Sequence, residues 1–164
     1  MQTIGFHELY QKYSRDVYRF AVYLTGDVAL AEDVTSETFV RVWSSPEPVR
    51  LATVKAYLLT IARNLCQMEY RRTSKSRALD ESAPDLARNA AEIAEARDEL
   101  DMVLRVLRDF PEADRAALLM RAEAGLSYEE IAAALGLPVS TVKVKVHRTR
   151  LKLAQLRIKG VIAK

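Results

Sequence analysis

The chain lacks the features that define several classes of protein. Its 164 residues include a single cysteine, Cys66, so no disulfide forms within the chain, and we expect a partly buried thiol in a reducing compartment, the cytoplasm. No run of about 18 apolar residues predicts a transmembrane helix. The N-terminus has no basic stretch followed by an apolar stretch, so we expect neither a signal peptide nor membrane insertion.

Residue patterns that carry catalysis are also missing. The sequence has no Gly-rich phosphate loop, no Cys/His cluster at metal-ligand spacing and no nucleophile with an obvious base. The two histidines, His7 and His147, are isolated and far apart. We therefore predict that the chain is not an enzyme and uses no metal or other cofactor.

No segment alternates apolar and polar residues with period two, so we predict an all-α fold. Apolar residues at helical spacing predict a first helix from about Phe6 to Leu24 and a second, capped by Asp27, that ends near Trp43. A third helix is predicted from about Val54 to Arg72. Its expected inner face consists of Tyr57, Leu58, Ile61, Leu65 and Met68.

Periodicity fades after Thr73 and resumes near Ala91, in a helix expected to run to Phe110. A further helix begins at Pro111 and ends at Gly125. We therefore predict two small helical domains, residues 1–75 and 95–160, joined by a flexible linker at residues 76–94.

Residues 127–153 fit a helix-turn-helix. The small side chain of Ala132 suits the point where two helices cross closely, and Gly136 tolerates the positive φ of a tight turn. Val142 closes the small core from the second helix. Ser127 and Glu130 form a capping box for the first helix, and we expect Ser140 to cap the second.

The second helix of this pair is basic on its exposed side. No Asp or Glu occurs from Val139 to the C-terminus, while helical spacing turns Val142, Val146, Thr149 and Leu153 inward. Such a helix suits a DNA major groove flanked by phosphates. A solvated surface helix is the alternative, but the turn spacing and the one-signed charge favour DNA.

Three motifs in order resemble a known family. They are AEDVTSETFVRVW (Ala31 to Trp43), KAYLLTIARNL (Lys55 to Leu65) with Arg71 and Arg72, and LSYEEIAAALGLPVSTVKVKVHRTRLKL (Leu126 to Leu153). In this order they resemble bacterial RNA polymerase sigma factors of the sigma-70 family, and the short two-domain form resembles the extracytoplasmic function (ECF) group. The likeness extends over nearly the whole chain and implies region 2-like and region 4-like domains.

The resemblance implies a polymerase-binding surface on the second helix. It comprises Asp33, Glu37, Phe39, Arg41 and Trp43. An acidic and aromatic helix face suits a basic partner helix. Core packing is the alternative for Phe39 or Trp43.

For the promoter −10 element the resemblance implies a second set of residues. It comprises Arg50, Arg63, Asn64, Tyr70, Arg71 and Arg72. The loop from Ser44 to Thr53 matches the family loop that captures a flipped base, although it could be a mere connector. Asn64 suits a base contact or helix packing equally.

For the −35 element the resemblance implies a third set, on the recognition helix. It comprises Ser140, Thr141, Lys143, Val144, Lys145, His147 and Arg148. We expect base contacts from Lys143, Val144 and His147. Lys145 and Arg148 are expected to anchor the DNA backbone.

The resemblance predicts a sigma factor that binds core RNA polymerase and promoter DNA, helps melt the −10 region, and is held inactive by an anti-sigma factor. One alternative is a dimeric helix-turn-helix regulator with a helical sensor domain. It explains the C-terminal half equally well but leaves the Ala31 to Trp43 motif unexplained. A helical adaptor protein is a further alternative, which leaves the basic helix unexplained.

Overall fold

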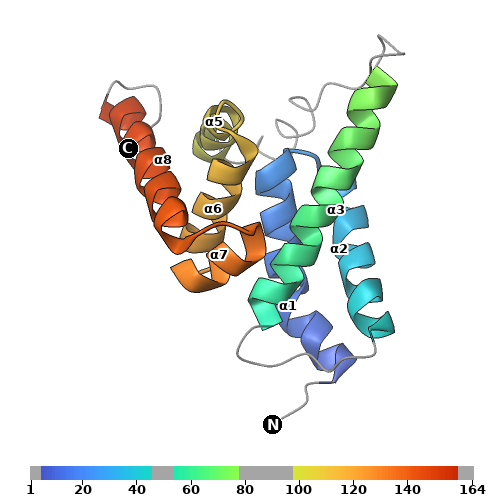
Figure 1. Cartoon of the computed structure of the whole chain (residues 1–164). Coiled ribbons are helices and arrows are strands. Elements are labelled where there is room, and N and C mark those ends of the chain that lie inside the picture. The colour runs from blue at the N-terminus through green and yellow to red at the C-terminus, as the bar shows by residue number, and fades with distance from the viewer. Residues whose placement is uncertain (1–4, 46–53, 78–97, 159–164) are drawn as a thin grey trace.

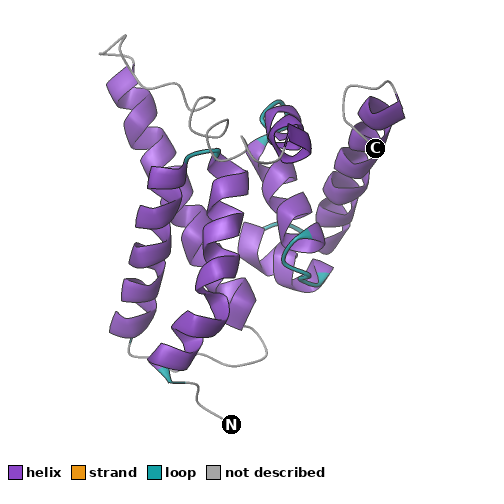
Figure 2. Cartoon of the chain, turned by 180° about the vertical axis from the view of Figure 1, so that it is seen from behind, coloured by secondary structure: helices purple, strands orange, loops and turns teal. Residues whose placement is uncertain are grey.

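The computed structural model describes residues 5–45, 54–77 and 98–158, and within these ranges it contains helices and no strand. The predicted all-α fold is confirmed. The helices are α1 Phe6–Thr25, α2 Val28–Ser44, α3 Val54–Arg77, α5 Asp98–Leu107, α6 Glu112–Ala122, α7 Tyr128–Leu135 and α8 Val139–Ile158. The first three form one bundle and the last four a second bundle beside it (Figures 1 and 2).

The first bundle is built as the apolar pattern predicts. Gly26 ends α1 with a φ of 72°, a left-handed conformation that glycine adopts without strain. Asp27 then caps α2, where its Oδ1 accepts a hydrogen bond from the backbone N–H of Leu30 at 3.1 Å. Val17 and Phe20 are each 1% exposed and lie in the shared core of α1, α2 and α3.

The predicted helix-turn-helix is confirmed in α7 and α8. The Ser127 hydroxyl accepts from the Glu130 N–H, and the Glu130 carboxylate accepts from the Ser127 N–H, so both halves of the capping box form. Gly136 has a φ of 66°, and Val142 is fully buried. Ser140 does not cap α8, because that helix begins one residue earlier, at Val139.

The expectation for the inner face of α3 is wrong in part. Tyr57 and Met68 are 39% and 53% exposed. The buried stripe runs instead through Leu58, Leu59, Ala62, Leu65 and Cys66. Apolar residues lie on more than one side of α3, so their spacing alone does not show which side is buried. Packing against α1 and α2 determines the buried side.

Helix α3 continues to Arg77, two residues past the predicted end of the first domain at residue 75. The rest of the predicted linker, together with residues 91–97 of the helix expected from Ala91, lies outside the described residues.

The two bundles share an apolar core. Helix α6 packs on α1, and α7 packs on α3. Buried residues of both bundles, from Leu9 to Val146, belong to one continuous cluster. The bundles therefore lie against each other in this structure. The predicted flexible linker between two domains did not imply this contact.

The turn between α7 and α8 depends on glycine at position 136. A Cβ added there meets no atom within 4 Å, so Gly136→Ala tests the backbone conformation alone. We expect the left-handed φ to cost about 1 kcal/mol with alanine and to lower the melting temperature by about 2–4 °C. Circular dichroism during heating measures this change.

The matched control is Gly5→Ala, which also has open space around its Cβ but a φ of −71°. Equal melting temperatures for the two variants would contradict the role assigned to the turn.

Candidate nucleic-acid and protein interfaces

The predicted −35 residues divide into two groups on α8. Lys143, Val144 and His147 are exposed, Val144 at 58%, whereas Val142 and Val146 on the opposite side are buried. Ser140 is exposed and Thr141 partly exposed in the first turn of the helix. The side of α8 that faces away from its own bundle thus presents charge, hydroxyls and the apolar side chains of Val144 and, further along the helix, Leu151.

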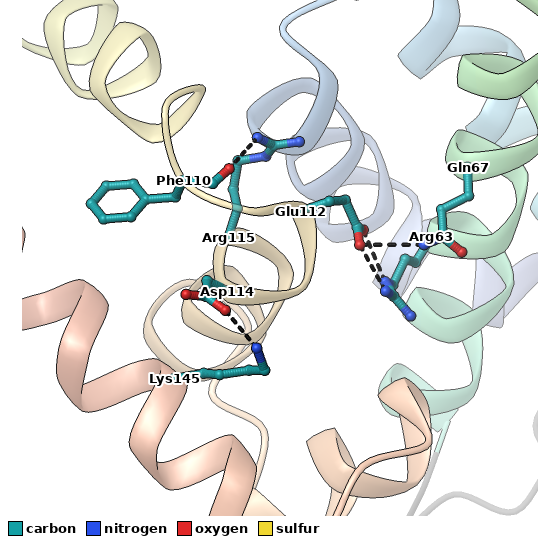
Figure 3. Close-up of polar contacts among 7 residues, drawn as sticks. All are labelled: Arg63, Gln67, Phe110, Glu112, Asp114, Arg115 and Lys145. Atoms are coloured by element: carbon teal, nitrogen blue, oxygen red, sulfur yellow. Dashed lines mark hydrogen bonds and ion pairs between the residues drawn. The ribbon is translucent and has the colours of Figure 1, made fainter.

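Lys145 and Arg148 have a partner inside the protein. The Nζ atom of Lys145 donates to Oδ1 of Asp114 on α6 at 2.8 Å, and an Arg148 guanidinium nitrogen donates to Oδ2 at the same distance (Figure 3, which draws the lysine contact). Burial alone would raise the pKa of the Asp114 carboxyl, but these hydrogen bonds and positive charges outweigh it and lower the pKa. Asp114 is therefore ionised at neutral pH.

The predicted −10 residues on α3 are mostly open to solvent. Asn64, Tyr70 and Arg71 are exposed, Tyr70 at 64%. Arg72 is exposed and pairs with Glu69 one turn earlier, at 2.9 Å. Arg50 and its loop lie outside the described residues.

Arg63 differs from the rest of the −10 set because it is bound by the other bundle. Its Nε and one terminal nitrogen donate to both carboxylate oxygens of Glu112 at 2.9 and 2.7 Å, and Gln67 donates to the same carboxylate at 3.3 Å (Figure 3). The Arg63 side chain is only 11% exposed. In this arrangement Arg63 cannot contact DNA.

Weaker polar contacts cross the same boundary. Arg19 pairs with Glu123 at 2.7 Å, and the Lys55 ammonium donates to the carbonyl oxygen of Ala124 at 3.2 Å. The sequence did not indicate roles for Glu112, Asp114 and Glu123. The first two lie in the first turn of α6 and Glu123 directly follows that helix. The partner of each is at least 31 positions away, so no local spacing could have indicated the pair.

An aromatic surface joins the N-terminal part of α1 to the end of α2. The ring centroids of Phe6 and Trp43 are 4.8 Å apart, and those of Tyr10 and Phe39 are 5.0 Å apart. Phe39 is 2% exposed and packs in the core, whereas Trp43 is 69% exposed. Of these two predicted polymerase-binding residues, only Trp43 is open to solvent, and exposed Asp33, Glu37 and Arg41 lie on the same helix.

Cys66 lies at the boundary between the bundles. It is 3% exposed, more buried than expected, and it lines a cavity of about 620 Å³ together with Glu112 and Phe110. Burial raises the pKa of the Cys66 thiol to about 12, with a smaller contribution from the negative charge of Glu112. The folded protein therefore holds an unreactive thiol in the arrangement described.

In the described parts of the chain, no helix is long and apolar enough to cross a bilayer. These parts also hold no group of three His, Cys, Asp or Glu side chains suited to a metal ion.

Family comparisons match both bundles. Residues 9–76 match Sigma-70 region 2, and residues 100–153 match Sigma-70 region 4. The ECF RNA polymerase sigma factor SigL of Mycobacterium tuberculosis is 32% identical over 145 residues, which cover 85% of this chain and 81% of SigL. SigM of Bacillus subtilis is 31% identical over 157 residues, 94% of this chain and 96% of SigM.

A solved structure shares the fold. It is the sigma factor RpoE bound to the anti-sigma factor NepR from Bartonella quintana, with a TM-score of 0.73, 24% identity, and coverage of 92% of this chain and 95% of that one. The chain belongs to the sigma-70 family of RNA polymerase sigma factors, in its ECF group.

The ion pair between Arg63 and Glu112 predicts how Cys66 reacts. Replacing Arg63→Gln removes a partly buried bidentate pair worth about 1 kcal/mol, which favours separation of the bundles about fivefold. We expect Cys66 to react about fivefold faster with dithionitrobenzoate, because separation exposes the thiol. The release of thionitrobenzoate measures the rate.

Arg15→Gln removes the same charge from an exposed position on α1 and serves as the control. Because Glu112 is retained in both variants, a lost negative charge cannot explain a difference between them. Equal rates would show that the pair does not hold the bundles together.

Proposed function

We propose that this chain is a non-enzymatic initiation factor of the bacterial cytoplasm that binds core RNA polymerase and directs it to promoters with −10 and −35 elements. The observation that carries this function is the pair of separate basic surfaces, on α3 and α8, each on its own helical bundle. A dimeric regulator needs only one of them. Membership of the ECF group supports the same function.

The described side chains support a division of roles. Trp43, with Asp33, Glu37 and Arg41, forms the polymerase-binding surface of α2. Asn64, Tyr70, Arg71 and Arg72 form the −10 surface, where an amide and an aromatic ring suit unstacked bases and arginines suit phosphates. The −35 surface comprises Ser140, Thr141, Lys143, Val144, Lys145, His147 and Arg148 of α8.

The two promoter elements are too far apart for the bundles to read both while packed together. Their centres are about 25 base pairs apart, or about 85 Å along B-form DNA at ~3.4 Å per base pair. A compact chain of this length has a radius of gyration of about 15 Å. The domains at residues 1–75 and 95–160 therefore separate on a promoter, and Arg63 then joins the −10 surface.

An anti-sigma factor is the proposed inhibitory partner. The related RpoE was solved with the anti-sigma factor NepR. A protein that stabilised the packed arrangement of the two bundles would keep Arg63 on Glu112 and prevent the chain from reaching both elements. Inhibition then follows from linkage, because a ligand that binds one state more tightly shifts the population toward it.

Transcription by purified core RNA polymerase, with and without the chain, tests the function on a genomic fragment library. We expect promoter-specific starts only when the chain is present, because core polymerase alone does not select promoters. Alignment of the start sites would reveal both elements. Unchanged starts, with polymerase-free binding of the chain to a palindrome, would indicate the dimeric regulator instead.

Trp43 provides a sharper test of the polymerase-binding surface. Trp43→Ala should weaken binding to core polymerase about tenfold or more, because exposed tryptophans supply much of the binding energy at interfaces. Thermal stability should change little, since the side chain is 69% exposed. Fluorescence anisotropy of the labelled chain, titrated with core polymerase, measures the affinity.

Tyr57→Ala is the matched control, since Tyr57 is an exposed aromatic residue on a different helix. Equal affinities for the two variants would remove Trp43 from the interface.

A further inference from the structure

Asp114 places a negative charge beneath a helix that contains no acidic residue. It lies in the first turn of α6, is 2% exposed, and accepts hydrogen bonds from Lys145 and Arg148 with its two separate oxygens. A buried carboxylate is costly unless it is hydrogen-bonded and paired with positive charge, and both conditions are met here. The surroundings of position 114 therefore favour an ionised carboxylate over other side chains.

The two cationic side chains that bind Asp114 differ in how much of each remains open to solvent for a ligand. The Lys145 side chain is 20% exposed, and its single charged nitrogen is bound to Asp114. The Arg148 side chain is 60% exposed and bonds Asp114 through one nitrogen of its fork. The rest of this side chain is open to solvent, on the helix that also carries exposed Lys143 and His147.

We propose that Asp114 is a positioning residue for reading the −35 element: it orients the guanidinium of Arg148 toward DNA and withdraws Lys145 from the phosphates. This inference rests on the proposed function. It divides the two residues that were expected to share one role. Arg148 becomes a preorganised contact, and Lys145 becomes a brace between α8 and α6.

The proposal has a distinctive physical consequence. A freely moving lysine attracts any phosphate, so it adds to non-specific binding without adding sequence information. A guanidinium fork held in one orientation loses less conformational freedom when it binds. Asp114 therefore increases the preference for the −35 element over other DNA in two ways. It reduces non-specific attraction to phosphates, and it preorganises a specific contact.

Asp114→Asn tests this in holoenzyme assembled from core RNA polymerase and the full chain. The probes are a promoter fragment recovered from the transcription experiment and a duplex of the same length with a scrambled −35 element. We expect affinity for the promoter to fall about tenfold, as for loss of one oriented contact. Affinity for the scrambled duplex should rise about two- to threefold, because Lys145 is released.

Asp109→Asn is the control for charge, because it makes the same change at an exposed position in the turn before α6. A purely structural role for Asp114 would lower both affinities together, along with thermal stability. That result, or behaviour equal to Asp109→Asn, overturns the proposal. If the transcription experiment with the wild-type chain yields no promoter fragment, the proposed function is refuted instead.

A second pair of variants decides the matter even if Asp114→Asn does not fold. Lys145→Met keeps the apolar stem and removes the charge, and Lys143→Met does the same at an exposed position. We expect Lys143→Met to reduce the slope of log affinity against log salt by about one, and Lys145→Met to leave it nearly unchanged. Equal reductions would place Lys145 on the phosphates and overturn the proposal.

Discussion

The first turn of α6 connects the two described bundles to each other and to helix α8 through ion pairs. Glu112 and Asp114 are two residues apart, which on a helix with 3.6 residues per turn separates them by about 200°. They therefore point to opposite sides: Glu112 binds Arg63 on α3, and Asp114 binds Lys145 on α8 (Figure 3). Asp114 also binds Arg148 of the same helix. Negative charge is also favourable at a helix N-terminus. One turn of helix thus contacts both helices that carry the proposed promoter contacts.

The two carboxylates differ in how firmly they bind. Asp114 is buried within one bundle and uses both oxygens on α8, so breaking its contacts would leave a buried charge unpaired. Glu112 is 31% exposed and bridges the bundles, where water replaces its partner if they part. Exposed ion pairs such as Arg19 with Glu123 add at most about 1 kcal/mol. The contact within the bundle is thus the costlier of the two to break.

Local rules predicted the local structure well. The capping box at Ser127, the left-handed glycine at position 136 and the cap at Asp27 all depend on residues within four positions of one another, so the sequence displays them directly. Glu112 and Asp114 depend on partners 31 to 49 positions away, which a single sequence does not display. The prediction for the inner face of α3 was partly wrong for a related reason. Periodicity allowed more than one apolar side of the helix to be buried, and tertiary packing determined which one is.

Exposed apolar side chains provide a last argument about the surfaces, because soluble proteins expose large apolar patches mainly where partners bind. In the described part of the chain, Val40 and Trp43 lie on α2, Tyr57, Met68 and Tyr70 on α3, and Val144 and Leu151 on α8, while Tyr10 lies on α1. All of these except Tyr10 are therefore on the three helices with proposed polymerase, −10 and −35 contacts. On α8, Val144 stands among cations, where a branched apolar side chain adds nothing to phosphate binding. It suits a thymine methyl group in the major groove, so the proposed −35 surface would combine attraction to the DNA backbone with a contact that depends on sequence.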